Sequence, residues 1–177
     1  MEAPDEQLML AYRDGDAGAF ETLYRRHRGA LYRFVLRGVK NRATAEELYQ
    51  EIWIRVIEAR ARYTPQARFT TWLYTIAHNR MVDHWRKKEI AAIPLEENLS
   101  TSAVLNPERQ AAGREALARL ARAIDELPHV QREAFLLHEE GGLTISEIAV
   151  ATGAGEEAAK SRLRYAMAKL KAAVDDG

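Results

Sequence analysis

Apolar residues recur at steps of three and four along most of this chain, which is the spacing of one face of an α-helix. Three such stripes occupy the first 60 residues: Leu8, Ala11 and Tyr12; Phe20, Leu23, Tyr24, His27, Leu31, Phe34 and Val35; and Ala45, Leu48, Ile52, Val56 and Ala59. The strict alternation of apolar and polar residues that marks a β-strand is nearly absent. The sequence therefore predicts an all-α fold.

The helical pattern is interrupted by a stretch that contains Pro94 and Pro107 and has no sustained amphipathic face. It resumes after that stretch, stops at Pro128 and runs again to the pair that begins at Gly141. We therefore expect two small helical domains, 1–90 and 113–177, joined by a flexible linker, 91–112.

The composition excludes several classes of protein. The chain of 177 residues has no cysteine, so disulfides, cysteine-zinc sites and thiol switches are excluded. It has no run of roughly 18 apolar residues, and its first residues are acidic where a secretory signal would be basic. We therefore expect a cytoplasmic protein.

The charge is partitioned along the chain, although its 26 basic and 26 acidic side chains sum to zero. Residues 55–89 hold eight basic and three acidic side chains, and residues 160–171 hold five basic ones and no acid. Such blocks fit the neutralisation of nucleic-acid phosphates, although a solvated helix face can carry the same pattern.

The second basic block follows the signature of a helix-turn-helix. Thr144 and Glu147 have the capping-box spacing, which predicts a helix from about residue 145. Gly153 lies four residues after Ala149, where a small residue and a turn glycine let two helices cross. The next helix has an apolar stripe, namely Ala159, Leu163, Ala166, Met167 and Leu170, and a basic opposite side. This pattern favours DNA binding over an ordinary helical hairpin.

In the first basic block, cations are interleaved with aromatic residues. Stacking on aromatic rings while cations hold the backbone is typical of single-strand recognition, but aromatic residues at helical spacing are also core residues. The spacing favours a core position for Trp85, whereas for Trp72 it favours neither a core position nor an exposed one. The short polar loop 64–68 is suited to hold an extruded base.

An acidic, aromatic segment precedes this block. Glu46, Glu47, Gln50 and Glu51 cluster away from the apolar stripe, with Trp53 beside them. An exposed tryptophan flanked by acids is typical of a protein interface, and the alternative is that Trp53 packs inside.

Together and in this order, these segments resemble the extracytoplasmic-function (ECF) sigma factors of the sigma-70 family over nearly the whole chain. The resemblance rests on the segments 45–51 and 69–79, Asp83 with Arg86, and the short motifs that begin at Leu127, Gln131, Glu147 and Lys160. It implies that the first domain is sigma region 2, which docks on core RNA polymerase and opens the −10 element. The second would be region 4, which reads the −35 element.

The residue patterns and the resemblance together assign residues to these tasks. Docking on the β′ clamp falls to Glu47, Gln50, Glu51 and Trp53. Recognition of the −10 element falls to Thr64, Gln66, Arg68, Phe69, Trp72, Asn79, Arg80, Asp83 and Arg86. Recognition of the −35 element falls to Lys160, Ser161, Arg162, Arg164 and Tyr165. The family usually has Thr-Val at 158–159 and an Arg at 165, so this chain is expected to have either a weaker affinity for duplex DNA or an unusual −35 preference.

The expected partners are core RNA polymerase, through its β′ clamp and β flap, promoter DNA and an anti-sigma factor. The alternative is a one-component helix-turn-helix regulator with an N-terminal effector domain. An enzyme is disfavoured because the five histidines are dispersed and no metal, nucleophile or phosphate-loop spacing occurs. We expect no catalytic residue, metal, cofactor or small-molecule substrate.

Overall fold

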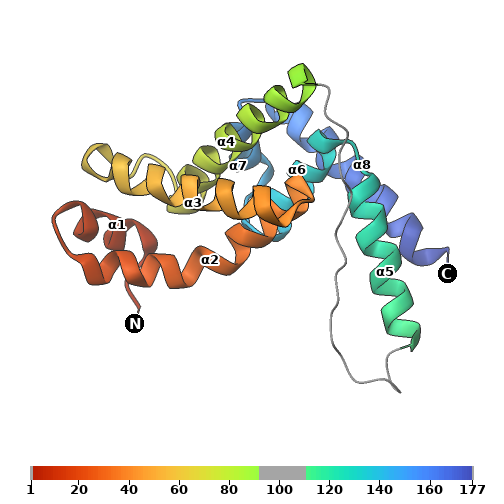
Figure 1. Cartoon of the computed structure of the whole chain (residues 1–177), viewed down its shortest axis with the longest axis horizontal. Coiled ribbons are helices and arrows are strands. Elements are labelled where there is room, and N and C mark those ends of the chain that lie inside the picture. Colours follow the sequence, from red (N-terminus) through yellow and green to blue (C-terminus); the bar gives the residue numbers. More distant parts are fainter. Residues whose placement is uncertain (1, 92–110, 177) are drawn as a thin grey trace.

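The computed structural model describes residues 2–91 and 111–176, and the chain is helical throughout these ranges apart from short turns (Figure 1). Its elements are α1 (Asp5–Arg13), α2 (Ala17–Val39), α3 (Arg42–Ala59), the 3-10 helix η1 (Arg60–Arg62), α4 (Phe69–Ala91), α5 (Ala111–Glu126), α6 (His129–Glu139), α7 (Ile145–Thr152) and α8 (Glu156–Asp175). The described residues contain no strand, so the predicted all-α class is confirmed.

Local side-chain caps fix where several of these helices begin. The Asp16 carboxylate accepts a hydrogen bond from the Ala19 amide at 3.2 Å, and the Asn41 side chain accepts one from the Thr44 amide at 3.0 Å. Each cap pairs an amide that has no partner within its helix. The predicted break at Pro128 is also observed, because it separates α5 from α6.

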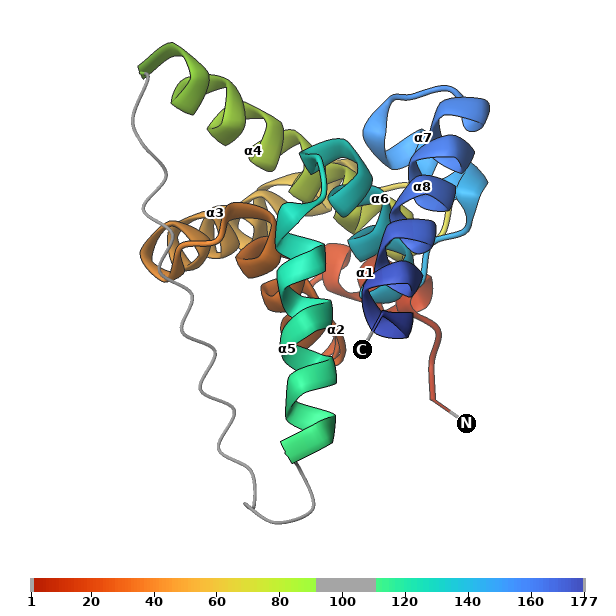
Figure 2. The ribbon, with the colours of Figure 1, turned by 90° about the vertical axis from the view of Figure 1, so that its right-hand side faces the viewer.

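Helices α1 to α4 form one half of the molecule, and α5 to α8 form the other (Figures 1 and 2). Helices α5 and α8 lie side by side, joined by a small apolar cluster around Leu127, Ala166 and Leu170. Helices α6 and α7 lie between this pair and the first half, where α7 packs on α4 and α6 packs on α2. The ends of the predicted linker belong to α4 and α5, and its residues 92–110 lie outside the described ranges.

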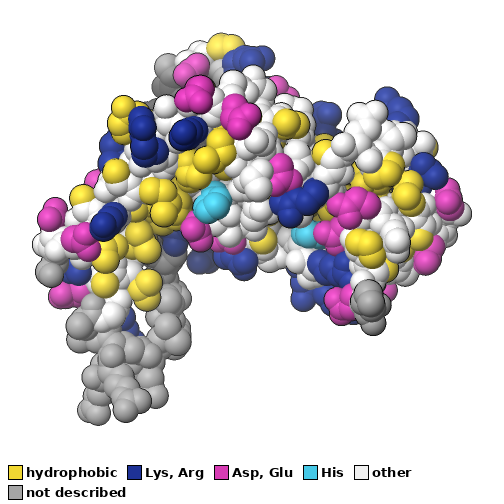
Figure 3. Space-filling model, turned by 180° about the vertical axis from the view of Figure 1, so that it is seen from behind, with side chains coloured by type: hydrophobic (Ala, Val, Ile, Leu, Met, Phe, Trp, Pro, Cys, Tyr) yellow, Lys and Arg dark blue, Asp and Glu magenta, His cyan; other side chains and the backbone are white. Residues whose placement is uncertain are grey.

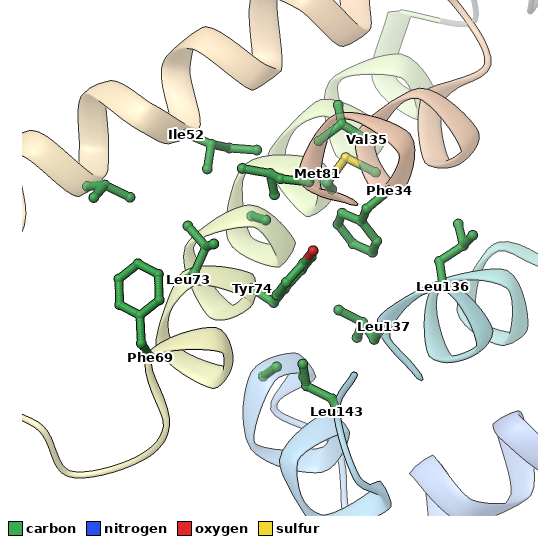
Figure 4. Close-up of a cluster of buried hydrophobic side chains, with 14 of the residues drawn as sticks. Phe34, Val35, Ile52, Phe69, Leu73, Tyr74, Met81, Leu136, Leu137 and Leu143 are labelled. Carbon is green, nitrogen blue, oxygen red and sulfur yellow. The ribbon is translucent and has the colours of Figure 1, made fainter. Parts of the chain in front are cut away.

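The main core is continuous across the two halves. Phe34 from α2 and Tyr74 from α4 lie in the same buried cluster as Leu136, Leu137 and Leu143 from the second half (Figure 4). The rings of Phe34 and Tyr74 meet edge to face, with centroids 5.3 Å apart. The second half is therefore packed against the first half through apolar side chains.

Candidate nucleic-acid interface

Helices α7 and α8 form the predicted helix-turn-helix. The Thr144 hydroxyl accepts a hydrogen bond from the Glu147 amide at 3.2 Å, and the Glu147 carboxylate accepts one from the Thr144 amide at 3.0 Å. This completes the expected capping box. Gly153 ends α7 with φ +67°, which is the left-handed conformation predicted for the turn. Ala149 and Ala159 are buried, so small side chains occur on both of these packed helices.

Helix α8 presents a basic, accessible face. Lys160, Arg164 and Tyr165 are exposed, and the Arg164 guanidinium lies 5.4 Å from the centroid of the Tyr165 ring. Ser161 and Arg162 are half-buried. All five residues expected to read the −35 element therefore retain accessible surface on one helix.

The buried stripe of α8 is narrower than the sequence pattern predicted. Ala159, Ala166 and Leu170 are buried, and Leu163 packs against the core. Met167 is 44% exposed, so its assignment to the buried stripe is wrong. At 100° per residue, Met167 falls toward the edge of the face that Ala159 and Ala166 define.

The loop before α4 and the outer face of α4 hold most of the residues expected at the −10 element. Thr64, Gln66 and Arg68 are exposed in the loop. Along α4, Asn79 and Arg86 are exposed, and Trp72, Arg80 and Asp83 are half-buried. These residues lie in the loop and along α4 between residues 64 and 86.

Phe69 departs from that expectation. Its side chain is 0% exposed and lies against Trp72, with ring centroids 5.8 Å apart, so a direct contact of Phe69 with DNA is contradicted. Trp72 also meets Tyr63 edge to face at 5.0 Å. Phe69 therefore packs against the Trp72 ring from the interior of the protein. Trp85 packs against the core, as its spacing in the sequence predicted, and its ring centroid lies 4.8 Å from that of His129.

The acidic face of α3 is exposed at Glu46, Glu47 and Gln50 and half-buried at Glu51. Trp53 is only 6% exposed and packs on Phe20, Tyr24 and Tyr49, so the expectation of an exposed tryptophan anchor is wrong. The apolar stripe of α3 is wide enough to include it.

Ile54 takes the place at the surface that Trp53 was expected to occupy. It is 52% exposed and lies four residues after Gln50, on the same side of α3. Ile54 was not among the predicted docking residues, although its spacing from Glu47 and Gln50 could have identified it. The candidate docking face of α3 therefore consists of Glu47, Gln50, Glu51 and Ile54.

One ionic network joins this docking face to α4. The Arg80 guanidinium forms an ion pair with Glu51, with Nε 3.1 Å from Oε2, and a second ion pair with Asp83 at 3.3 Å. Residues expected to serve docking and residues expected to serve −10 recognition are thus in direct contact.

A second network joins α7 to the loop before α4. Arg68 donates to the Glu147 carboxylate from Nε at 2.7 Å and from Nη2 at 3.0 Å, and the Thr71 hydroxyl donates to it at 2.8 Å. Partial burial acts to raise the pKa of the Glu147 carboxyl, but the hydrogen bonds from Arg68, Thr144 and Thr71 outweigh it and lower this pKa to about 2. Glu147 is therefore ionised throughout the physiological range.

The histidines do not assemble a reactive centre. His78 pairs with Glu133, and His27 pairs with Asp5, which also forms an ion pair with Arg26; each of these contacts joins two helices. Within the described ranges, no group of three or more histidine and acidic side chains is placed to hold a metal ion. No helix in the described part of the chain is long and apolar enough to cross a membrane.

Comparison with known proteins adds to this geometry. The sequence matches Sigma-70 region 2 over residues 23–90 and Sigma-70, region 4 over residues 117–170. It is 35% identical to the RNA polymerase sigma factor CarQ of Myxococcus xanthus over 165 residues, which cover 92% of this chain and 93% of CarQ. It is 32% identical to the ECF RNA polymerase sigma factor RpoE of Cereibacter sphaeroides over 168 residues, or 93% and 91% of the two chains.

The fold is similar to that of CnrH, solved in complex with the cytosolic domain of CnrY. The TM-score is 0.70, the identity is 25%, and the match covers 97% of each chain. An all-α chain with a basic helix-turn-helix and two sigma regions is a DNA-binding transcription initiation factor. This chain belongs to the sigma-70 family of RNA polymerase sigma factors, in its ECF group.

It is accordingly an alternative sigma factor that directs transcription initiation, and sigma domains bind core RNA polymerase and promoter DNA. The one-component regulator considered above is not favoured by these relatives. Sigma factors are regulatory DNA-binding proteins, which agrees with the expected absence of an enzyme signature.

Proposed function

We propose that residues 1–90 dock on core polymerase and read the −10 element, and that residues 113–177 read the −35 element. The observation that carries the proposal is the accessible basic face of α8, which follows the capped helix α7 in the helix-turn-helix. A helix of this kind enters the major groove with its cations at phosphates and its other side chains at base edges. Lys160 and Arg164 contact phosphates, and Ser161, Arg162 and Tyr165 lie nearer the bases.

The −10 element is read by the loop 64–68 and the outer face of α4. The loop side chains Thr64, Gln66 and Arg68 are exposed beside the partly exposed Trp72 ring, which is supported from inside the protein. A supported ring with cations nearby stacks an unpaired base while the backbone is held. Asn79, Arg80, Asp83 and Arg86 continue this surface along α4.

Docking on the β′ clamp uses Glu47, Gln50 and Ile54, with Glu51 at the edge of the face. An exposed isoleucine surrounded by polar side chains supplies apolar contact area, and the acids supply charge complementarity to a basic partner. Region 4 makes the second polymerase contact, at the β flap.

Two weak DNA-binding surfaces on one chain bind a promoter bivalently, because once the first is bound the second meets its DNA element at a high effective concentration. The protein performs no catalysis and acts in the cytoplasm. An anti-sigma factor is its regulatory partner. This part of the proposal is supported by the CnrH structure, which is a complex with the cytosolic domain of CnrY.

The docking assignment is tested by measuring binding to core polymerase for Glu47→Ala, Gln50→Ala and Ile54→Ala. We expect each to weaken binding, and Ile54→Ala most, since truncating an aliphatic side chain that is buried in an interface removes apolar contact and leaves a cavity. Glu21→Ala, an exposed acid on α2, is the matched control. Unchanged affinity for all three variants refutes the assignment. Glu51→Ala is less informative because it also releases Arg80.

A further inference from the structure

A cavity of about 300 Å³ lies where the end of α2 and the second half of α4 meet the beginning of α6 (Figures 1 and 2). This volume is at the lower end of the range for small-molecule sites, roughly 300–1,000 Å³. None of the described residues that line the cavity is among those assigned above to polymerase docking or to DNA recognition. The cavity is therefore a separate feature of the molecule.

The lining of this cavity is basic. Lys40, Lys88 and Arg132 reach it from the end of α2, from α4 and from α6, and Glu89, which is exposed, is the one carboxylate among the described lining residues. Lys40 also donates a hydrogen bond to the carbonyl of Asp125. Over the face of the molecule drawn in Figure 3, by contrast, basic and acidic side chains are interspersed. Cations gathered around one hollow attract an anion, and walls of low polarity strengthen the attraction.

Arg132 is the buried cation of the site. It is 8% exposed, and its Nη2 donates to the Leu127 carbonyl at 2.9 Å. Its Nε is also buried but has no hydrogen-bond partner. The Asp125 carboxylate acts on Arg132 electrostatically, but it does not line the cavity. A buried donor without a partner is costly, and a charged donor of this kind is satisfied well by an anion.

Helix α6 begins at the same cavity. Its N-cap residue, Pro128, forms no side-chain cap, although the helix is 11 residues long. The first residue of α6, His129, and Arg132, one turn further on, both line the cavity. An uncapped helix N-terminus has a partial positive charge and amides without a partner in the helix, which favour a phosphate.

Most of the wall surface is apolar. Gly38 and Val39 are buried there, and Trp85 is half-buried and lines the same space. The tryptophan ring offers a flat apolar surface of the kind on which nucleobases stack. The site thus combines a cationic, buried donor with an aromatic wall.

We propose that this cavity binds a nucleoside diphosphate, with the phosphates at Lys88, Arg132 and the beginning of α6 and the base against Trp85. Such a ligand carries both chemistries that the lining presents, a multiply charged group and a flat ring. Because α4 belongs to the first half of the chain and α6 to the second, the ligand contacts both halves, and its binding stabilises the folded chain by mass action.

Calorimetric titration of the full chain with ADP, GDP, inorganic pyrophosphate and adenosine tests the ligand class. We expect both nucleotides to bind, pyrophosphate to bind about tenfold more weakly because it has no ring to stack, and adenosine to bind more weakly still because it has no charge. Pyrophosphate binding as tightly as ADP overturns the assignment to a nucleotide. No heat from any phosphate-bearing probe overturns the site.

Variants of neighbouring residues on α4 test the cavity itself. Lys88→Ala should weaken ADP binding about three- to tenfold, the size of one partly exposed charged contact. Lys87→Ala is the matched control, because it removes an exposed lysine that does not line the cavity and should leave the affinity unchanged. Glu89→Gln should tighten binding, since it removes the carboxylate at the rim. Equal losses in Lys87→Ala and Lys88→Ala, or weaker binding by Glu89→Gln, contradict the proposal.

The imidazole of His84 reports whether the ligand lies in this cavity. His84 lines it, and its Nε2 is buried without a hydrogen-bond partner. Burial and the nearby Lys88 cation lower the pKa of His84. A bound phosphate favours the charged imidazole, so saturation with ADP should raise this pKa in a nuclear magnetic resonance titration. If ADP binds and the pKa of His84 stays where it was, the ligand lies elsewhere and the proposal is refuted.

Discussion

The basic face of α8 predicts how the affinity for duplex DNA depends on salt. Lys160 and Arg164 are exposed, one turn apart on that face. Each phosphate contact on B-DNA contributes about 0.9 to the slope of log affinity against log salt, so Lys160→Ala with Arg164→Ala should lower the slope by about 1.8. At roughly 0.1 M salt this corresponds to about 60-fold weaker binding, with little change when the data are extrapolated to 1 M.

The assay is anisotropy of a labelled duplex titrated at several salt concentrations. The phosphate contribution is independent of sequence, so no promoter need be known. Lys169→Ala is the matched control. It lies nine residues from Lys160, half a turn around α8, and donates to Gln131 of α6 at 3.2 Å. An unaltered slope in the double variant, or an equal fall in Lys169→Ala, refutes the assignment of this face.

Three further predictions concern stability. Leu137→Ala should lower the free energy of unfolding by about 2–5 kcal/mol in a denaturant titration, because Leu137 is fully buried between the halves. Gly153→Ala should lower the free energy of unfolding by about 1–2 kcal/mol, because the φ of +67° is unfavourable for any residue with a Cβ atom, although that atom would meet no neighbour. Gly155→Ala is the control: its φ of −69° suits any residue, and it should change stability by less than about 0.5 kcal/mol. The lowered pKa of Glu147 stabilises the fold above its unfolded value of 4.5, and this contribution is lost as pH falls toward 2. Thermal melts of Glu147→Gln should therefore depend less on pH in that range.

The features that the sequence predicted correctly are local. The capping box at Thr144, the turn at Gly153 and the break at Pro128 each depend on a few neighbouring residues, and all three are observed. The stripes of α2 and α3 were predictable for the same reason, because a helix repeats its contacts every three or four residues.

The features that the sequence could not predict depend on which helix faces which. Trp53 was expected at the surface because acids flank it, and Phe69 was expected at the DNA interface with its segment, yet both are covered by residues of other helices, Phe20 for Trp53 and His27 for Phe69. The contact between Arg68 and Glu147 joins residues 79 positions apart. No periodicity in either segment records such a pairing, which follows from how the two halves pack.

The ion pair between Glu51 and Arg80 makes two binding events thermodynamically dependent on each other. A partner that draws Glu51 away leaves Arg80 with one carboxylate, that of Asp83, and so makes its guanidinium more available to an anion. By linkage, an anion bound to Arg80 favours the release of Glu51 by the same factor. Residues on neighbouring helices thus couple the occupancy of the two faces without any change of fold.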